Sequence, residues 1–155
     1  MSETVSDRLK ALSITLPAAS APAANYLPFA ATENLLFISG QLPTENGRMV
    51  ATGHLGADVS LEDGQKAARA CAINIIAQIN AALDGDLDRV KRVLKLSGFV
   101  ASAPDFTDQH LVINGASDLI AAVFGDASKH SRAAVGMAAL PLNAAVEIDA
   151  IVEIA

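Results

Sequence analysis

The C-terminal segment 146–154 alternates between apolar and polar positions, which predicts a β-strand. Every even position is apolar, and three of the four odd positions carry a carboxylate. Successive strand side chains point to opposite sides, so this period of two indicates one packed face and one partly polar face. Apolar runs within Asn34–Ser39 and Val90–Ala101 predict two further strands, the first of them buried on both faces. The Asn46-Gly47 pair predicts a hairpin turn that leads to a short strand near Met49–Thr52.

Two longer segments have apolar residues at helical spacing. The first begins after Ser60, which is a typical N-cap residue, and continues to Gly85. The second opens at Pro104-Asp105 and ends at Gly125. A shorter helical pattern over Thr4–Leu12 precedes a small-residue tract with two prolines, which predicts an extended arm.

The order of these elements predicts an α+β fold. It runs strand, strand, helix, strand, helix, strand, strand, which favours a mixed sheet of about six strands covered on one face by two helices. Residues 1–155 suit a single domain, with residues 1–25 as an N-terminal helix and arm. No further helix remains for the second face of the sheet, so self-association is the simplest way to bury it.

Composition narrows the class of function. The formal net charge of -6 and the lack of any window rich in Lys or Arg disfavour nucleic acid as a partner. No apolar run reaches the roughly 18 to 20 residues of a membrane span, and the N-terminus lacks a signal-peptide layout. We therefore expect a cytoplasmic protein with no membrane partner.

The single cysteine, Cys71, lies on the apolar face of the first long helix and is expected to be a buried thiol.

Arg132 and Glu147 are the leading candidates for chemistry. A guanidinium can hold a carboxylate through two parallel hydrogen bonds, although an arginine on an edge strand can also simply extend into water. Glu147 lies in an apolar strand, where burial raises and a nearby cation lowers the pKa of a carboxyl group. The alternative for Glu147 is an ordinary polar residue on the wet face of the strand.

The distance between these two residues poses a geometric problem. If their strands formed one simple hairpin, Glu147 would lie on the order of 17 Å from Arg132. Either the two strands are not direct neighbours, or the site borrows groups from another subunit.

The segment that begins at Arg132 resembles the C-terminal signature of the RidA/YjgF family of reactive intermediate deaminases. It contains an arginine, a small-residue strand, a Leu-Pro pair and Val-Glu-Ile-Asp-Ala, with Glu147 fifteen positions after the arginine. The segment 26–43, which ends in Ser-Gly-Gln-Leu-Pro, resembles the N-terminal motif of the same family. The resemblance covers about residues 26–151.

This resemblance implies a chorismate-mutase-like fold and a homotrimer with ligand cavities between subunits. It also implies hydrolysis of small enamine or imine intermediates to 2-keto acids and ammonia, with no cofactor and no metal. Arg132 would bind the substrate carboxylate, and Glu147 would orient the attacking water. The resemblance further implies contacts to substrate from Tyr26, Ser39, Gly40 and Asn114.

Taken alone, the same residues allow plainer interpretations. Tyr26 could be a packed aromatic side chain, Ser39-Gly40 a strand end and Asn114 a solvated helix residue. The sequence also departs from short members of the family, because it is about one helical turn longer before Ser131. In addition, Ala134 replaces the cysteine often found two places after the arginine. These differences and the N-terminal arm indicate a distinct subgroup, so the substrate range of the family does not carry over.

Two other functions stay open at this point. A non-catalytic trimer that binds small carboxylate metabolites would keep Arg132 without depending on Glu147. An endoribonuclease or translation inhibitor is disfavoured by the acidic charge. His54, His110 and His130 lack metal-ligand spacing, so core, surface or capping roles are expected for them.

Overall fold

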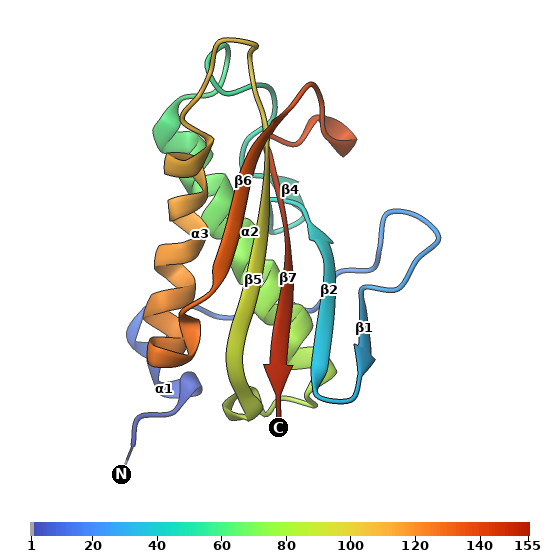
Figure 1. Cartoon of the computed structure of the whole chain (residues 1–155), viewed down its shortest axis with the longest axis vertical. Coiled ribbons are helices and arrows are strands. Elements are labelled where there is room, and N and C mark those ends of the chain that lie inside the picture. Colours follow the sequence, from blue (N-terminus) through green and yellow to red (C-terminus); the bar gives the residue numbers. More distant parts are fainter. Residues whose placement is uncertain (1) are drawn as a thin grey trace.

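In the computed structural model, which describes residues 2–155, five strands form one mixed sheet (Figure 1). They are β1 (Phe29–Thr32), β2 (Leu35–Gln41), β5 (Val90–Ala101), β6 (Ser131–Met137) and β7 (Val146–Ile154). Their order across the sheet is β1-β2-β7-β5-β6. β5 and β6 are parallel, and all other neighbouring pairs are antiparallel. The predicted α+β fold with a mixed sheet is confirmed.

Helices and a small hairpin complete the described part of the chain. The helices are α1 (Val5–Ala11), α2 (Leu61–Ala82) and α3 (Gln109–Phe124), with the short 3₁₀ turns η1 (Leu87–Arg89), η2 (Gly125–Ser128) and η3 (Pro141–Asn143). The hairpin consists of β3 (Thr44–Glu45) and β4 (Arg48–Met49), which form a separate two-stranded sheet. The main sheet therefore has five strands, where the sequence predicted about six.

α2 and α3 cover one face of the sheet; in Figure 1, α2 passes behind the strands and α3 lies at the left, beside β6. α2 packs on β2 and β7, while α3 packs beside β5 and β6. The even-numbered residues 146–152 of β7 are at most 2% exposed, whereas the odd-numbered ones are partly exposed. The period of two predicted for this strand is therefore confirmed, with its apolar residues facing the helices.

The other face of the sheet, called here the open face, has no helix over it in the described residues. Phe37 of β2 and Val135 of β6 point to this side and are 42% and 44% exposed. The prediction that β2 is buried on both faces was wrong, because only alternate residues such as Leu36 and Ile38 face the helices. A period of two was hidden by the continuous apolar run.

Most predicted element boundaries are confirmed. The strand predicted over Val90–Ala101 matches β5, and Ser60 caps α2 by accepting a hydrogen bond from the Asp63 amide. α3 starts later than predicted, at Gln109 instead of near Pro104. Phe106 packs over Gly56, and its amide donates to the Ala103 carbonyl, so the chain forms a turn before the helix begins. β1 was not predicted. Phe29 is partly buried but the other three residues of the strand are exposed, so its sequence shows no alternation of apolar and polar residues.

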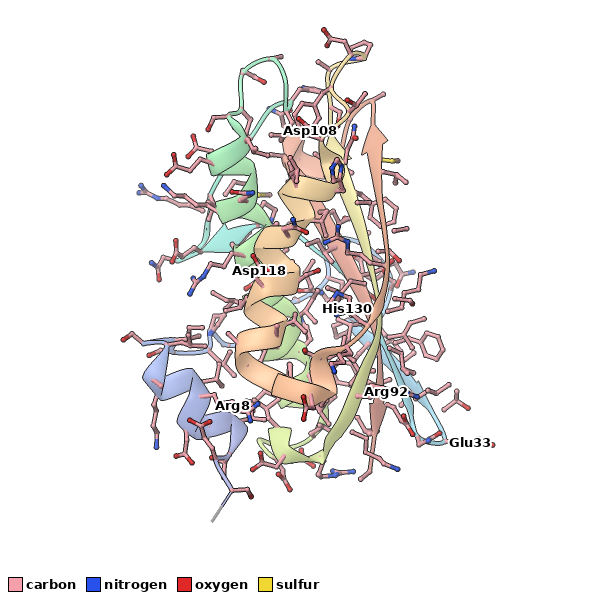
Figure 2. The ribbon with its side chains drawn as sticks, turned by 60° about the vertical axis from the view of Figure 1, so that its left-hand side comes forward. Arg8, Glu33, Arg92, Asp108, Asp118 and His130 are labelled. Atoms are coloured by element: carbon pink, nitrogen blue, oxygen red, sulfur yellow. The ribbon has the colours of Figure 1, made fainter. Side chains whose placement is uncertain are left out.

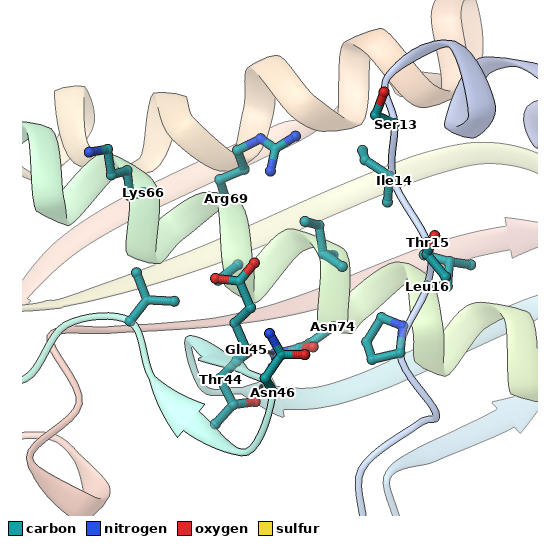
Figure 3. Close-up of a pocket in the computed structure, with 14 residues that line it drawn as sticks. Ser13, Ile14, Thr15, Leu16, Thr44, Glu45, Asn46, Lys66, Arg69 and Asn74 are labelled. Atoms are coloured by element: carbon teal, nitrogen blue, oxygen red, sulfur yellow. Dashed lines mark hydrogen bonds between the residues drawn. The ribbon is translucent and has the colours of Figure 1, made fainter.

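The N-terminal arm crosses the outer side of α2 and is held there by Gln78, which donates a hydrogen bond of 2.9 Å to the Ser20 carbonyl. Ile14 and Leu16 of the arm pack against the core. A cavity of about 510 Å³ lies between the arm, the β3–β4 hairpin and α2, as Figure 3 shows. None of the residues predicted to carry chemistry lines this cavity.

The segment Gln109–Ser128 is long and apolar enough to cross a membrane by length and composition alone. Its apolar character has another explanation in this fold, because α3 packs against α2 and two strands. Val112, Ile113 and Ile120 are fully buried there. We therefore interpret α3 as a core helix.

The crossing of α2 and α3 depends on Gly115. A β-carbon at this position would overlap the backbone carbonyl of Gln65 in α2, and backbone cannot move aside as a side chain can. Gly64 on α2 differs, because a β-carbon there would meet Leu55 Cδ1, the end of a flexible side chain, at 2.8 Å.

We expect Gly115→Ala to lower the free energy of unfolding by about 2–3 kcal/mol, because the two helices must separate. The matched change Gly64→Ala should alter it by less than about 1 kcal/mol, since the gain in helix propensity offsets a small shift of Leu55. Urea unfolding followed by circular dichroism measures both. Equal losses for the two variants would contradict the role of the close crossing.

Candidate functional site

Arg132 is held by three acceptors along one face of α3. Its Nη1 donates to Asn114 Oδ1 at 2.8 Å and to Ser117 Oγ at 3.1 Å, and its Nη2 donates to the His110 carbonyl oxygen at 3.1 Å. Residues 110, 114 and 117 follow the i, i+4, i+7 spacing of one helix face. The parallel pairing of β6 with β5 sets Arg132 opposite Leu96, on the helix side of the sheet. The structure therefore brings Arg132 and Asn114 into direct contact.

The guanidinium keeps capacity to bind a ligand. It has five N–H donors, and the three bonds to α3 use three of them. The Nε–H and one Nη2–H stay available, and two donors are what a bidentate carboxylate contact needs. Within residues 2–155, no carboxylate oxygen lies within 4.0 Å of Arg132. Its positive charge is thus oriented but not neutralised by this chain.

Glu147, Ser39 and Gly40 form a second group, on the open face of the sheet. A β-carbon at Gly40 would lie 2.8 Å from Glu147 Cδ, so glycine at this position makes room for the carboxyl group. The hydroxyl of Ser39 donates to the Leu27 carbonyl at 2.6 Å, which ties the chain next to Tyr26 to β2. Tyr26 and Gly40 both line a cavity of about 190 Å³, which residues 20–23 of the arm also wall.

Burial raises the pKa of Glu147 above its ordinary value, and the neighbouring carboxylate of Asp149 raises it further. Within residues 2–155, the Glu147 carboxylate forms no ion pair. A carboxyl group of this kind takes up and releases a proton closer to neutral pH than an exposed glutamate does.

Arg132 and Glu147 lie on opposite faces of the sheet of one chain. β5 separates their strands, because Arg132 pairs with Leu96 and Glu147 pairs with Phe99 on its other edge. Leu96 and Phe99 are three residues apart, so their side chains point to opposite faces. Of the two explanations offered by the sequence, the first is confirmed, since the strands are not direct neighbours. One chain nevertheless leaves the two residues on different faces.

Sequence reasoning missed two residues beside Arg132. Ser117 and His130 hydrogen-bond to each other at 2.9 Å, and Ser117 also contacts the guanidinium. The signal available was spacing, because Ser117 lies one helical turn after Asn114.

Cys71 is fully buried, as predicted, and burial raises the pKa of its thiol well above the usual range. A thiol of this kind stays protonated and is a poor nucleophile.

The raised pKa of Glu147 predicts a pH dependence of stability. The folded protein holds this proton more tightly than the unfolded chain, so the stabilisation by the protonated carboxyl is lost as pH rises above about 4.5, the ordinary value. Glutamine does not titrate, so we expect Glu147→Gln to lack this pH-dependent loss of stability. Between about pH 4.5 and 7, the free energy of unfolding of wild type should therefore fall relative to that of the variant. Urea titrations at several pH values test this. Glu153, on the same strand face but paired with Lys91 and Arg92, provides the control Glu153→Gln, which should give no such relief.

Comparisons with known proteins agree with the fold and with the family that the sequence resembles. Residues 6–154 match the family described as "YjgF/chorismate_mutase-like, putative endoribonuclease". TCP17 of Trypanosoma cruzi is 54% identical over 151 residues, which cover 97% of this chain and 94% of TCP17. The crystal structure of Atu1372 from Agrobacterium tumefaciens is 59% identical, with a TM-score of 0.92 over 97% of this chain and 92% of that chain. RidA from the Antarctic bacterium Psychrobacter is 25% identical, with a TM-score of 0.60 over 88% of this chain and 94% of its own. The chain therefore belongs to the YjgF/RidA family.

Proposed function

We propose that this protein hydrolyses small enamine or imine intermediates to 2-keto acids and ammonia, without a cofactor. The observation that carries the proposal is the Arg132 guanidinium, fixed by three neutral acceptors and left with two free donors. Such an arrangement suits the carboxylate of an amino-acid-derived imine. Membership of the YjgF/RidA family supports the same class of substrate. We place this activity in the cytoplasm.

In this proposal each group has a defined role. Arg132 binds the substrate carboxylate, and Asn114 holds the guanidinium while its amide nitrogen offers a donor to the substrate. Glu147 accepts a proton from the attacking water. As the water oxygen bonds to the imine carbon, the C=N π electrons move to the nitrogen, which takes the proton held by Glu147. The nitrogen of this carbinolamine then takes the hydroxyl proton, and the C–N bond breaks to release ammonia and the keto acid. An enamine substrate first becomes its imine by moving a proton from nitrogen to carbon. An imine carbon is already electrophilic, so orientation and one placed water supply most of what the reaction needs.

The site is completed in a homotrimer. Arg132 and Glu147 lie on opposite faces in one chain, so they can meet only when the helix side of one β6 edge faces the open face of another subunit. The exposed apolar side chains on the open face, Phe37 and Val135, support burial against such a partner. Tyr26, Ser39 and Gly40 then contact substrate from the same subunit as Glu147.

A second function is a trimer that binds small carboxylate metabolites without turning them over. The observation that favours it is the asymmetry of the two groups, because Arg132 is fixed by three bonds whereas Glu147 has no ion-pair partner within residues 2–155. An endoribonuclease, the activity named in the family description, finds less support because the net charge is -6.

Kinetics with freshly generated 2-aminoacrylate separate these functions. We expect wild type to accelerate its loss, and Arg132→Ala to lower kcat/KM roughly 100-fold or more, because two charged hydrogen bonds are lost. Glu147→Gln should lower kcat roughly 100-fold with little change in KM. Lys66→Ala, which removes an exposed cation on the outer side of α2, is the control and should behave as wild type. If wild type binds a keto acid but gives no acceleration, the non-catalytic function is correct.

Mixing two inactive variants tests the shared site. Suppose that each site takes Arg132 from one subunit and Glu147 from the next. Random trimers of equal amounts of Arg132→Ala and Glu147→Gln then contain both intact residues at about a quarter of the sites. We expect recovery of roughly a quarter of wild-type activity after unfolding and refolding the two variants together, and a trimeric mass by light scattering. Absence of recovery in a mixed trimer would show that Arg132 and Glu147 must be intact in the same chain, which would contradict the shared site.

A further inference from the structure

A chain of hydrogen bonds extends behind Arg132 and ends at the backbone. His130 lies one residue before β6, half-buried, on the side of α3 that faces the strands (Figure 2). Its Nε2 is 2.9 Å from Ser117 Oγ, and its Nδ1 contacts the carbonyl oxygen of Ser128. Ser117 Oγ in turn lies 3.1 Å from Arg132 Nη1. Ser128 is only 6% exposed, which anchors the far end of this chain in the core.

The proton on each atom follows from what its partner can do. A carbonyl oxygen only accepts, so His130 Nδ1 carries a proton and donates it to Ser128. In the neutral ring Nε2 is then an acceptor, and the hydroxyl of Ser117 donates to it. The Ser117 oxygen keeps its lone pairs for the N–H of Arg132. One arrangement of protons therefore satisfies all three bonds.

This arrangement has a consequence for the guanidinium. A serine hydroxyl turns freely about its C–O bond unless a second partner fixes it. His130 supplies that partner, and the ring is itself fixed by the Ser128 carbonyl. The Ser117 oxygen thus presents its lone pair to Arg132 in one fixed direction. This restricts the orientation of the guanidinium at Nη1.

We propose that His130 is a positioning residue that acts through Ser117 to orient Arg132, so that its free Nε–H and Nη2–H meet a carboxylate ligand. The proposal rests on the proposed function, in which Arg132 binds the carboxylate of the substrate. His130 itself touches no substrate in this scheme. A purely structural role would differ, because His130 would then only tie the start of β6 to Ser128.

Four variants separate the positioning role from the structural one. The amide of His130→Asn reaches the place of Nδ1, so it keeps the bond to Ser128 and loses Ser117. The amide of His130→Gln reaches the place of Nε2 and keeps Ser117. Ser117→Ala removes the hydroxyl, and Ser117→Thr retains it. Ser131→Ala is the matched control, because the Ser131 hydroxyl donates to the Leu94 carbonyl and has no bond to Arg132.

The first readout needs no ligand. In ¹⁵N-labelled protein, the Nε–H signal of Arg132 is identified by its loss in Arg132→Lys. We expect this signal to be sharp in wild type, in Ser131→Ala, in Ser117→Thr and in His130→Gln, and broadened or shifted in Ser117→Ala and in His130→Asn. Circular dichroism confirms that each variant is folded. An unchanged signal in folded His130→Asn would overturn the proposal.

The second readout is the Kd of 2-oxobutanoate, a stable keto acid, by calorimetry. We expect Ser117→Ala and His130→Asn each to weaken binding roughly 3- to 10-fold, and Ser117→Thr and His130→Gln to stay within about 2-fold of wild type. In turnover the same pair should raise KM with little change in kcat. The double variant Ser117→Ala/His130→Asn should bind no more weakly than Ser117→Ala, since one residue acts through the other. Additive losses would overturn the proposal.

The two readouts also distinguish failure of this inference from failure of the proposed function. If wild type does not bind 2-oxobutanoate, the carboxylate role of Arg132 is wrong, while the Nε–H signal still decides whether His130 orients the guanidinium. If wild type binds the keto acid and His130→Asn binds it equally well, the proposed function stands and the inference about His130 fails.

Discussion

The parallel pairing of β5 with β6 is the constraint on which the rest of this structure depends. Parallel neighbours cannot be joined by a tight turn, so the chain must cross over between them, and α3 is that crossover. The helix consequently packs beside the strand that follows it. This places the face formed by His110, Asn114 and Ser117 over Arg132 at the edge of the sheet. The arginine is oriented by topology as well as by its own side chain.

The same topology divides the candidate site. β7 pairs with the other edge of β5, so Glu147 and Arg132 are attached to opposite sides of one strand and point to opposite faces. Helices α2 and α3 cover one face, and within residues 2–155 nothing comparable covers the other. The exposed Phe37 and Val135 therefore lie on the same face as Glu147. In the proposed homotrimer, a single association would both bury that apolar surface and complete the site.

The sequence predicted the elements better than their relations. Periodicity located α2, β5 and β7 because each has an apolar face that packs on one layer, which leaves a regular pattern. It failed at β1, which has no buried residue, and at the start of α3, where Phe106 packs outside the helix. Arg132, Asn114 and Glu147 were identified by a family motif. Ser117 and His130 were not. Spacing places Ser117 on the same helix face as Asn114, but its contact with His130 depends on how α3 lies against β6, which spacing does not encode.

Placing the two charged candidates on opposite faces also has an electrostatic rationale. Two opposite unit charges 4 Å apart attract by about 4 kcal/mol at an effective dielectric constant of 20. A direct ion pair between Arg132 and Glu147 within one chain would lower the pKa of Glu147 and occupy both groups before a ligand arrived, whereas in the proposed homotrimer the ligand lies between them. In the observed fold the arginine is fixed by neutral acceptors, which orient it without cancelling its charge. Glu147 meanwhile has its pKa raised by burial and Asp149. Each group therefore keeps the property that a carboxylate-bearing imine would use, a free cation on one side and a basic carboxylate on the other.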